Sequence, residues 1–338
     1  MNRRVIIRSS GVYHPSNKVD NDFFIDHFTK IDQELGGKVS RLLKNIGRKS
    51  RYLSQNPNEN ILTMAHKAVL CAISDAGIDA QQIDGIVFST ETPEYLVPSN
   101  ACMLRDILNA TNAHVVYDLN ANCAGMVVTV DQVRAFMQAN KRIKRVVVVG
   151  TAMLQRCGDD RNPITYASLG DAACAVVLEA VETEDEVGFV DSVYETDTEL
   201  IQSILYPKCG CAKSNDPDTT ESDKLLVWEP FDTTNTEACC AKLIKQVLSD
   251  NGYSKSDVSK VFFTQFSDGS RQRVAGLSGI ELDKFKYVGD IYGYTGTSSP
   301  FLAYHHASLD NELNPGDVLV FCGVGAGLTA AAVLFKVM

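Results

Sequence analysis

The feature of this chain that most constrains its fold is an internal repeat. Three sequence patterns of the first half return in the second half, in the same order and at nearly constant separation. The matching pairs are 75–90 with 250–265, 117–125 with 289–297, and 145–150 with 317–322. Any parallel sheet contains similar runs, but three ordered matches favour a duplicated half. We therefore expect two related halves, at 1–180 and 181–338, with a variable insertion at about 196–235.

Apolar β-branched runs alternate with amphipathic segments along the chain, a pattern typical of a layered α/β protein. We expect strands at 4–10, 85–90, 115–119, 145–150, 172–180 and 187–194 and helices at 21–44, 64–76, 100–108 and 127–137. Two such halves packed face to face would bring equivalent strand ends together near a pseudo-twofold axis, where ligands tend to bind. The strand ends expected to converge are Thr90, Cys123, Gln265, Tyr294 and the turn 323–327.

Charge and composition exclude several classes of function. The net charge of −10 argues against binding of a nucleic-acid backbone, and no apolar run reaches the ~18 residues of a membrane span. The N-terminus is basic and then strand-like, without the apolar stretch of a signal peptide, so a cytoplasmic protein is expected. The ten cysteines are scattered and lack paired spacing of the zinc-site kind. We expect neither a disulfide framework nor a metal site.

Cys123 is the leading candidate for a nucleophile. It follows the expected strand 115–119 and a small-residue turn, and the helical pattern 127–137 begins directly after it. Unpaired backbone N–H groups and the positive end of the helix dipole favour a thiolate at such a position. This order of strand, turn, cysteine and helix favours a nucleophile over a packing role.

Three motifs carry a resemblance to a known family. They are Asn122-Cys123-Ala124-Gly125 at mid-chain, Gly170-Asp171-Ala172-Ala173-Cys174-Ala175 about fifty residues later, and the terminal turn from Gly323 to Thr329. In this order they resemble the thiolase superfamily and, within it, the beta-ketoacyl-acyl-carrier-protein synthase III branch. The resemblance spans essentially the whole chain. It implies an α/β, thiolase-like five-layered αβαβα fold built from two duplicated halves.

The resemblance also implies a mechanism. Cys123 would attack a thioester of coenzyme A or of acyl carrier protein and hold the acyl group covalently, so the thioester is a substrate and no separate cofactor is expected. Backbone N–H groups of Cys123 and Ala326 occupy the positions that would form the oxyanion hole. Ala326 stands where the family usually has glycine. Gly325 and Gly327 would border the substrate, or would simply form a tight turn.

Two positions depart from the family pattern. The family pairs its cysteine with a histidine and an asparagine, and alignment on the repeat places Gln265 and Tyr294 there. Neither a neutral glutamine nor a tyrosine with a pKa near ~10 accepts and returns a proton easily at neutral pH. His305 and His306 belong to a later helical pattern. These departures argue against ordinary malonyl decarboxylation and favour an acyltransferase with a different acceptor, in fatty-acid, polyketide or related secondary metabolism.

Glu91 is a candidate replacement base. The run Ser89-Thr90-Glu91-Thr92 resembles the stretch of hydroxymethylglutaryl-CoA synthase that carries its acid/base glutamate. A carboxylate in an enclosed apolar site can have its pKa raised towards neutrality and then act as acid and base. A solvated loop glutamate is the alternative interpretation.

The surface that would hold the substrate handle is also altered. Arg41, Lys44 and Arg48 form a basic stretch without the tryptophan that the family often uses to stack on adenine. Such a surface could dock an acidic carrier protein or be a plain solvated face. The single tryptophan, Trp228, lies in the insertion and could cover the acyl channel or merely pack. Val97 occupies the position at which the family's dimer partner closes the acyl pocket, so the resemblance implies a homodimer.

Alternatives of other classes stay open. The chain could be a non-catalytic partner that forms a heterodimer with an active paralogue, as the Gln265 and Tyr294 departures would allow. It could also carry out a hydroxymethylglutaryl-CoA-synthase-like condensation that uses Glu91, or hydrolyse thioesters.

Overall fold

The structure is a computed structural model that describes all 338 residues. The strands are β1 (Asn2–Tyr13), β2 (Lys18–Asp20), β3 (Ser50–Tyr52), β4 (Gly85–Ser89), β5 (Val115–Leu119), β6 (Arg145–Ala152), β7 (Ala172–Thr183), β8 (Gly188–Thr196), β9 (Ile204–Leu205), β10 (Val227–Trp228), β11 (Val258–Phe263), β12 (Val318–Gly325) and β13 (Thr329–Lys336). The α-helices are α1 (Asn21–Ile31), α2 (Gln33–Asn45), α3 (Ile61–Ala76), α4 (Asn100–Ile107), α5 (Gly125–Ala139), α6 (Leu154–Cys157), α7 (Pro163–Ala167), α8 (Thr234–Asp250), α9 (Asp268–Ser278), α10 (Gly289–Tyr292) and α11 (Ser299–Leu309). Two short 3₁₀ turns matter for the site, η2 (Asn122–Ala124) and η6 (Gly296–Ser298).

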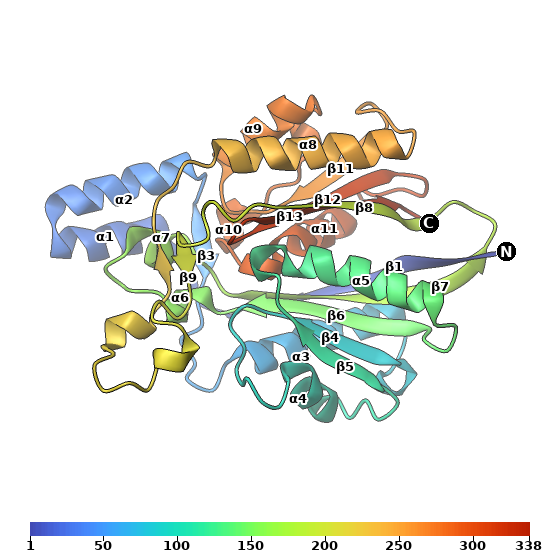
Figure 1. Cartoon of the computed structure of the whole chain (residues 1–338), viewed down its shortest axis with the longest axis horizontal. Helices are drawn as coiled ribbons and strands as arrows, with labels where there is room; N and C mark the ends of the chain where they lie inside the picture. The colour runs from blue at the N-terminus through green and yellow to red at the C-terminus, as the bar shows by residue number, and fades with distance from the viewer.

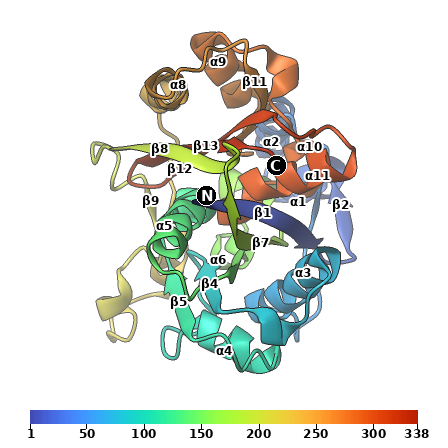
Figure 2. The same ribbon diagram turned by 90° about the vertical axis from the view of Figure 1, so that its right-hand side faces the viewer.

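Five layers of helix and sheet make up the molecule (Figures 1 and 2). Helices α5 and α11 lie between the two main sheets and share one apolar core with both. Helices α3 and α4 cover the outer face of one sheet, and α8 and α9 cover the outer face of the other. The expected αβαβα architecture is therefore confirmed.

The two sheets repeat one another in strand order and direction. The first sheet has the order β1-β7-β6-β4-β5, and the second, read from its β8 edge, has the order β8-β13-β12-β11. In each sheet the first two pairings are antiparallel and the third is parallel. This correspondence is what a duplication of one βα unit set produces, and it makes β5 the strand without a counterpart. The exact division at 180 and the extent of the insertion stay predictions.

Residues 289–297 do not repeat 117–125 as a strand, contrary to the expectation from the sequence. The segment begins as the short helix α10, and only a single bridge between Val261 and Phe285 remains where a fifth strand would pair. Both segments still end in a 3₁₀ turn followed by a helix, η2 before α5 and η6 before α11. The repeat thus held for the turn and the helix and failed for the strand.

The expected helix 21–44 is two helices. Asp32 has extended backbone angles (φ −159°, ψ 131°), and its side chain accepts from the N–H of Leu35 as the N-cap of α2. Its own N–H closes α1 on the carbonyl of Phe28. An aspartate at the break therefore ends one helix and starts the next, which is a common role of this residue. None of the helices combines the length and apolar content that crossing a bilayer requires.

Candidate active site

Cys123 lies in the turn η2, directly before the central helix α5. Gly125 allows this turn to approach the second half closely, because a Cβ there would lie 2.5 Å from Oγ of Ser89 and 2.8 Å from Oγ1 of Thr297. These two hydroxyls are 2.8 Å apart, and Oγ1 of Thr297 accepts from the N–H of Met126 at 2.8 Å. The first turn of α5 is thus anchored by a side chain from the equivalent turn of the other half.

The thiol of Cys123 faces the carboxyl group of Glu91. Cys123 is 8% exposed, and its Sγ donates to Oε1 of Glu91 at 3.8 Å. Burial raises the pKa of the Cys123 thiol most, and the negative charge of the Glu91 carboxylate raises it further. The prediction that the helix N-terminus would favour a thiolate was therefore wrong, because burial outweighs the dipole. A base is needed to remove the thiol proton.

Glu91 has the properties of such a base. Burial raises the pKa of its carboxyl group to about 7, and its Oε2 is buried without a hydrogen-bond partner. A carboxyl group with a pKa near neutrality can take and return a proton at physiological pH. Of the two interpretations of Glu91, the structure supports the enclosed carboxyl group rather than the solvated one.

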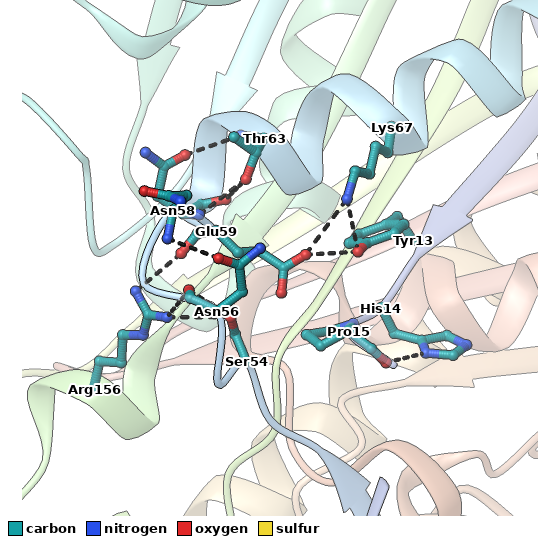
Figure 3. A network of polar contacts seen from close by, with 11 residues as sticks. Tyr13, His14, Pro15, Ser54, Asn56, Asn58, Glu59, Thr63, Lys67 and Arg156 are labelled. Carbon is teal, nitrogen blue, oxygen red and sulfur yellow. Dashed lines mark hydrogen bonds and ion pairs between the residues drawn. The ribbon is translucent and has the colours of Figure 1, made fainter. Parts of the chain in front are cut away.

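Two neighbours from different segments hold Glu91 beside the cysteine. Gly296 has a left-handed backbone (φ +60°), and a Cβ at this position would overlap with Oε1 of Glu91 and lie 3.1 Å from Cδ1 of Leu154. Leu154 begins α6, and Arg156 ties this short helix to the loop before α3 (Figure 3). Its guanidinium donates to the carbonyl of Glu59 at 3.0 Å and to Oγ of Ser54 at 3.1 Å. These hydrogen bonds therefore hold the short helix α6, and with it Leu154, in place.

A largely apolar cavity of about 240 Å³ opens onto Cys123. Its aromatic side is built from Trp228 and Phe266, whose ring centroids are 4.9 Å apart in a stacked pair, and from Tyr294, whose ring stands edge-on to Phe266 at 5.3 Å. The insertion supplies Trp228 together with Leu200, Ser203, Ile204, Pro230, Phe231 and Thr233. Residues of the expected insertion thus line the cavity, and Trp228 both packs and lines it.

The strand end of β12 forms the opposite side. Gly325, Ala326 and Gly327 all line the cavity. A Cβ at residue 325 would lie 2.9 Å from the carbonyl oxygen of Ala121 and 3.1 Å from the nitrogen of Ala124, so glycine permits close docking on η2. Nδ2 of Asn122 donates to the carbonyl of Ala326 at 3.0 Å. The predicted oxyanion pair, the N–H groups of Cys123 and Ala326, therefore belongs to two segments in direct contact.

Comparison with known proteins shows the family of the chain. Family models described as 3-oxoacyl-[acyl-carrier-protein] synthase III and its C-terminal part match residues 117–198 and 248–337. The chain belongs to this synthase III family. The family consists of condensing acyltransferases with the thiolase fold, so the resemblance read from the motifs is confirmed.

Relatives match over nearly the full length of the chain. A beta-ketoacyl-[acyl-carrier-protein] synthase III of Ehrlichia canis is 27% identical and aligns with 99% of this chain and 100% of its own. The crystal structure of 3-oxoacyl-[acyl-carrier-protein] synthase III from Aquifex aeolicus superposes with a TM-score of 0.84 at 23% identity, covering 98% of this chain and 99% of its own. OleA of Xanthomonas campestris, solved with bound lauric acid and lauroyl-CoA, has a TM-score of 0.81 at 16% identity and covers 98% and 99%. These two structures show the shared fold.

Within this synthase III site, Gln265 does not reach the cavity. It is 1% exposed, and its amide donates to the carbonyls of Phe263 (2.6 Å) and Lys286 (3.2 Å) and accepts from the N–H of Val288 (2.9 Å). These three hydrogen bonds of the Gln265 amide connect the end of β11 to the segment before α10. We therefore correct its assignment from a catalytic group to a structural one.

Thr264 directly follows β11 and lines the cavity together with Cys123, and the sequence reasoning missed it. It is 5% exposed, and the one hydrogen bond of its hydroxyl is accepted from the N–H of Val324 at 3.1 Å. Its hydroxyl hydrogen is therefore free to donate. No local sequence signal singles it out, because Thr264 and Gln265 are both polar and both follow the last residue of β11.

Tyr294 does face the cysteine. It is 2% exposed and lines the cavity, and burial together with the neighbouring thiol of Cys123 raises the pKa of its hydroxyl. The phenol is thus a neutral hydrogen-bond donor at physiological pH. Thr90, also expected at this junction, is buried but does not line the cavity.

The predicted substrate-handle residues fall into different environments. Arg41 and Lys44 are exposed on α2, whose Leu42 lines the cavity. Arg48 is 2% exposed and donates to the carbonyls of Gly289 and, at 2.8 Å, Phe266, so its assignment to a basic surface was wrong. Arg48 thus connects the first half of the chain to Phe266, a cavity-lining residue of the second half.

Val97 and the histidines lie away from the cavity. Val97 is 86% exposed on the loop before α4 and does not line the cavity of this single chain. His305 and His306 are residues of α11, as expected, where they contact Oγ of Ser10 and the hydroxyl of Tyr292. No histidine borders the cavity around Cys123.

Proposed function

We propose that this protein takes an acyl group from a thioester of coenzyme A or of acyl carrier protein onto Cys123 and passes it to an acceptor whose proton is removed by Glu91. The observation that carries the proposal is the contact of the buried thiol with a carboxyl group whose pKa is about 7, at the wall of an apolar cavity. Acyl transfer requires both groups, because Cys123 is the nucleophile and Glu91 is the base that removes its proton.

The two half-reactions use the same proton acceptor. In the first, the Cys123 thiol gives its proton to Glu91 while the sulfur attacks the thioester carbonyl, and the leaving thiolate recovers that proton as the carbon–sulfur bond breaks. In the second, the acceptor gives its proton to Glu91 and attacks the acyl-enzyme, and the released Cys123 sulfur is reprotonated. The N–H groups of Cys123 and Ala326 stabilise the oxyanion of both tetrahedral intermediates.

The same geometry disfavours a malonyl thioester as the acceptor. An ionised Glu91 next to Cys123 in a poorly solvated site repels a second carboxylate. The family uses a histidine and an asparagine to stabilise the enolate left by loss of carbon dioxide, whereas Thr264 and Tyr294 offer only neutral hydroxyls to this cavity. A suitable acceptor for a site with one carboxylate base is one whose attacking atom carries a removable proton, in an O–H, N–H, S–H or activated C–H bond. Condensation of the hydroxymethylglutaryl-CoA-synthase kind is the C–H case, and Glu91 favours it as a second candidate.

Two sets of exposed residues are candidate surfaces for binding partners. Arg41 and Lys44 on α2 flank the cavity-lining Leu42, and we assign to them the docking of the acidic carrier or of the coenzyme A phosphates. Leu96 and Val97 are 77% and 86% exposed on one loop, and this apolar exposure supports a homodimer in which the loop packs against a second copy.

Intact-mass measurement tests the proposal. The wild-type protein, Cys123→Ala and Glu91→Gln are incubated with a panel of acyl-CoA and acyl-carrier thioesters of differing length. We expect the mass of one acyl group on the wild type and none on Cys123→Ala. No adduct from any thioester would overturn the proposal and favour a non-catalytic partner. Rapid loss of the adduct in water alone would favour a hydrolase.

A further inference from the structure

Asn122, the residue directly before the nucleophile, has an unusual backbone. Its φ is +51°, in the left-handed region that residues with a Cβ rarely occupy, although asparagine tolerates it better than most. Its N–H donates to Oδ1 of Asn120 at 2.9 Å, so a second asparagine holds this conformation. Left-handed residues other than glycine gather at functional sites, which makes the role of this side chain worth testing.

The side chain of Asn122 connects the nucleophile turn to the predicted oxyanion loop. Its Nδ2 donates to the carbonyl of Ala326 at 3.0 Å across the junction of the two halves. On the other side, the N–H of Val324 donates to Oγ1 of Thr264 at 3.1 Å. The N–H of Ala326 therefore lies between two anchored peptide groups, one held from β11 and the other from the residue next to Cys123.

We propose that Asn122 is a positioning residue that fixes the N–H of Ala326 relative to Sγ of Cys123. The inference rests on the proposed acyl transfer through Cys123 and adds to it a residue with no part in proton transfer. Ala326 carries a methyl group where the family usually has glycine, and the residue before it, Gly325, packs closely on η2. A single amide bridge from the turn that bears the nucleophile keeps donor and nucleophile at a constant separation, and an error of about 1 Å in such a placement can cost about 100-fold in rate.

The alternative is that Asn122 only supports the turn, and the two roles make different predictions. Asn122→Gly retains the left-handed backbone without strain and removes the amide. If the residue positions the oxyanion donor, the acylation rate at saturating thioester falls while the KM changes little, since only the transition state is affected. The dependence of acylation on pH should stay as in the wild type, because Glu91 still removes the thiol proton.

The experiment measures single-turnover acylation of Cys123 by lauroyl-CoA and by a short-chain acyl-CoA, using intact mass, with the melting temperature as a check of folding. We expect Asn122→Gly to acylate about 10- to 100-fold more slowly at saturation. Asn122→Asp keeps the size of the side chain but presents only acceptors to the Ala326 carbonyl, so it should fall at least as far. The matched control is Asn311→Gly, because Asn311 has φ +55° in an exposed turn after α11.

The outcomes separate this inference from the function on which it rests. Wild-type acylation rates in both Asn122 variants, with no adduct on Cys123→Ala, would overturn the positioning role and leave the proposed function standing. A raised KM with an unchanged saturating rate would also overturn it. A wild-type protein that forms no adduct would overturn both.

Discussion

The Cys123 thiol and the Glu91 carboxyl group meet at 3.8 Å although the two residues follow different strands, β5 and β4, of the same sheet. The strands are parallel neighbours, so their carboxyl ends emerge side by side and the short extensions beyond them converge. The topology of the first half therefore brings the two residues together. The second half contributes the glycine that lets the carboxyl group come close, and the neutral hydroxyls across the cavity.

Replacement of Glu91 by glutamine should separate its acid/base role from its size. We expect Glu91→Gln to slow acylation of Cys123 by about 100- to 10,000-fold, the usual range for a lost general base. The pKa of about 7 also predicts a pH profile. The carboxylate form accepts the thiol proton, so the wild-type rate should rise from about pH 6 to about pH 8, and this rise should vanish in the variant.

Stopped-time mass measurements over that pH range would show the effect, with the exposed Glu94→Gln on the same loop as the control. An acylation rate in Glu91→Gln that equals the wild-type rate would remove Glu91 from the mechanism.

Gly296 should be necessary for Glu91 to approach the cysteine. Alanine at this position would place its Cβ against Oε1 of Glu91 and would strain a backbone with φ +60°. We expect Gly296→Ala to displace the carboxyl group and to lower the acylation rate by at least about tenfold. Gly316→Ala provides the control, because its φ of +90° carries similar backbone strain while its Cβ would meet open space. If both variants acylate equally fast, the approach of Glu91 to Gly296 has no catalytic meaning.

Much of this site could be predicted from the sequence, and the failures have physical causes. The small residues around Cys123 and the spacing of the repeat were sufficient to place the nucleophile between two similar halves, because close backbone approach demands glycine and alanine at defined positions. Glu91 was a candidate only through the resemblance of residues 89–92 to hydroxymethylglutaryl-CoA synthase, and the sequence left a solvated loop glutamate open. The pKa of the thiol was not predictable from the helix dipole, because burial depends on residues such as Leu154 and Trp228 that are distant in the sequence.

The assignment at the end of β11 failed for a more local reason. Gln265 and Thr264 are neighbours just beyond the end of β11, and of the two only Thr264 lines the cavity. The sequence offers no local sign of which residue faces Cys123, since both are polar. The partners that engage the Gln265 amide, Lys286 and Val288, lie more than twenty residues later in the chain, directly before α10.

Gln265 should therefore matter for stability rather than for chemistry. Truncation in Gln265→Ala removes three hydrogen bonds and leaves buried backbone groups of Phe263, Lys286 and Val288 without that partner. We expect a loss of about 2–5 kcal/mol in the free energy of unfolding. The fraction that remains folded should still acylate Cys123 at nearly the wild-type rate. Denaturant unfolding monitored beside the mass assay would check both, and a stable but inactive variant would return Gln265 to the catalytic machinery.

Thr264 gives the opposite expectation, since its hydroxyl lines the cavity and its hydrogen has no protein acceptor. Thr264→Val conserves the volume but removes both the donor to the substrate and the acceptor of the Val324 N–H. One neutral hydrogen bond is worth about 0.5–1.5 kcal/mol, so we expect a 2- to 10-fold slower reaction at saturation, roughly, with some loss of stability from the unpaired N–H. Thr264→Ser keeps the hydroxyl and should react at close to the wild-type rate. Single-turnover kinetics of these two variants decide the question, because only a role for the hydroxyl itself separates valine from serine, and equal rates for both would assign Thr264 to packing.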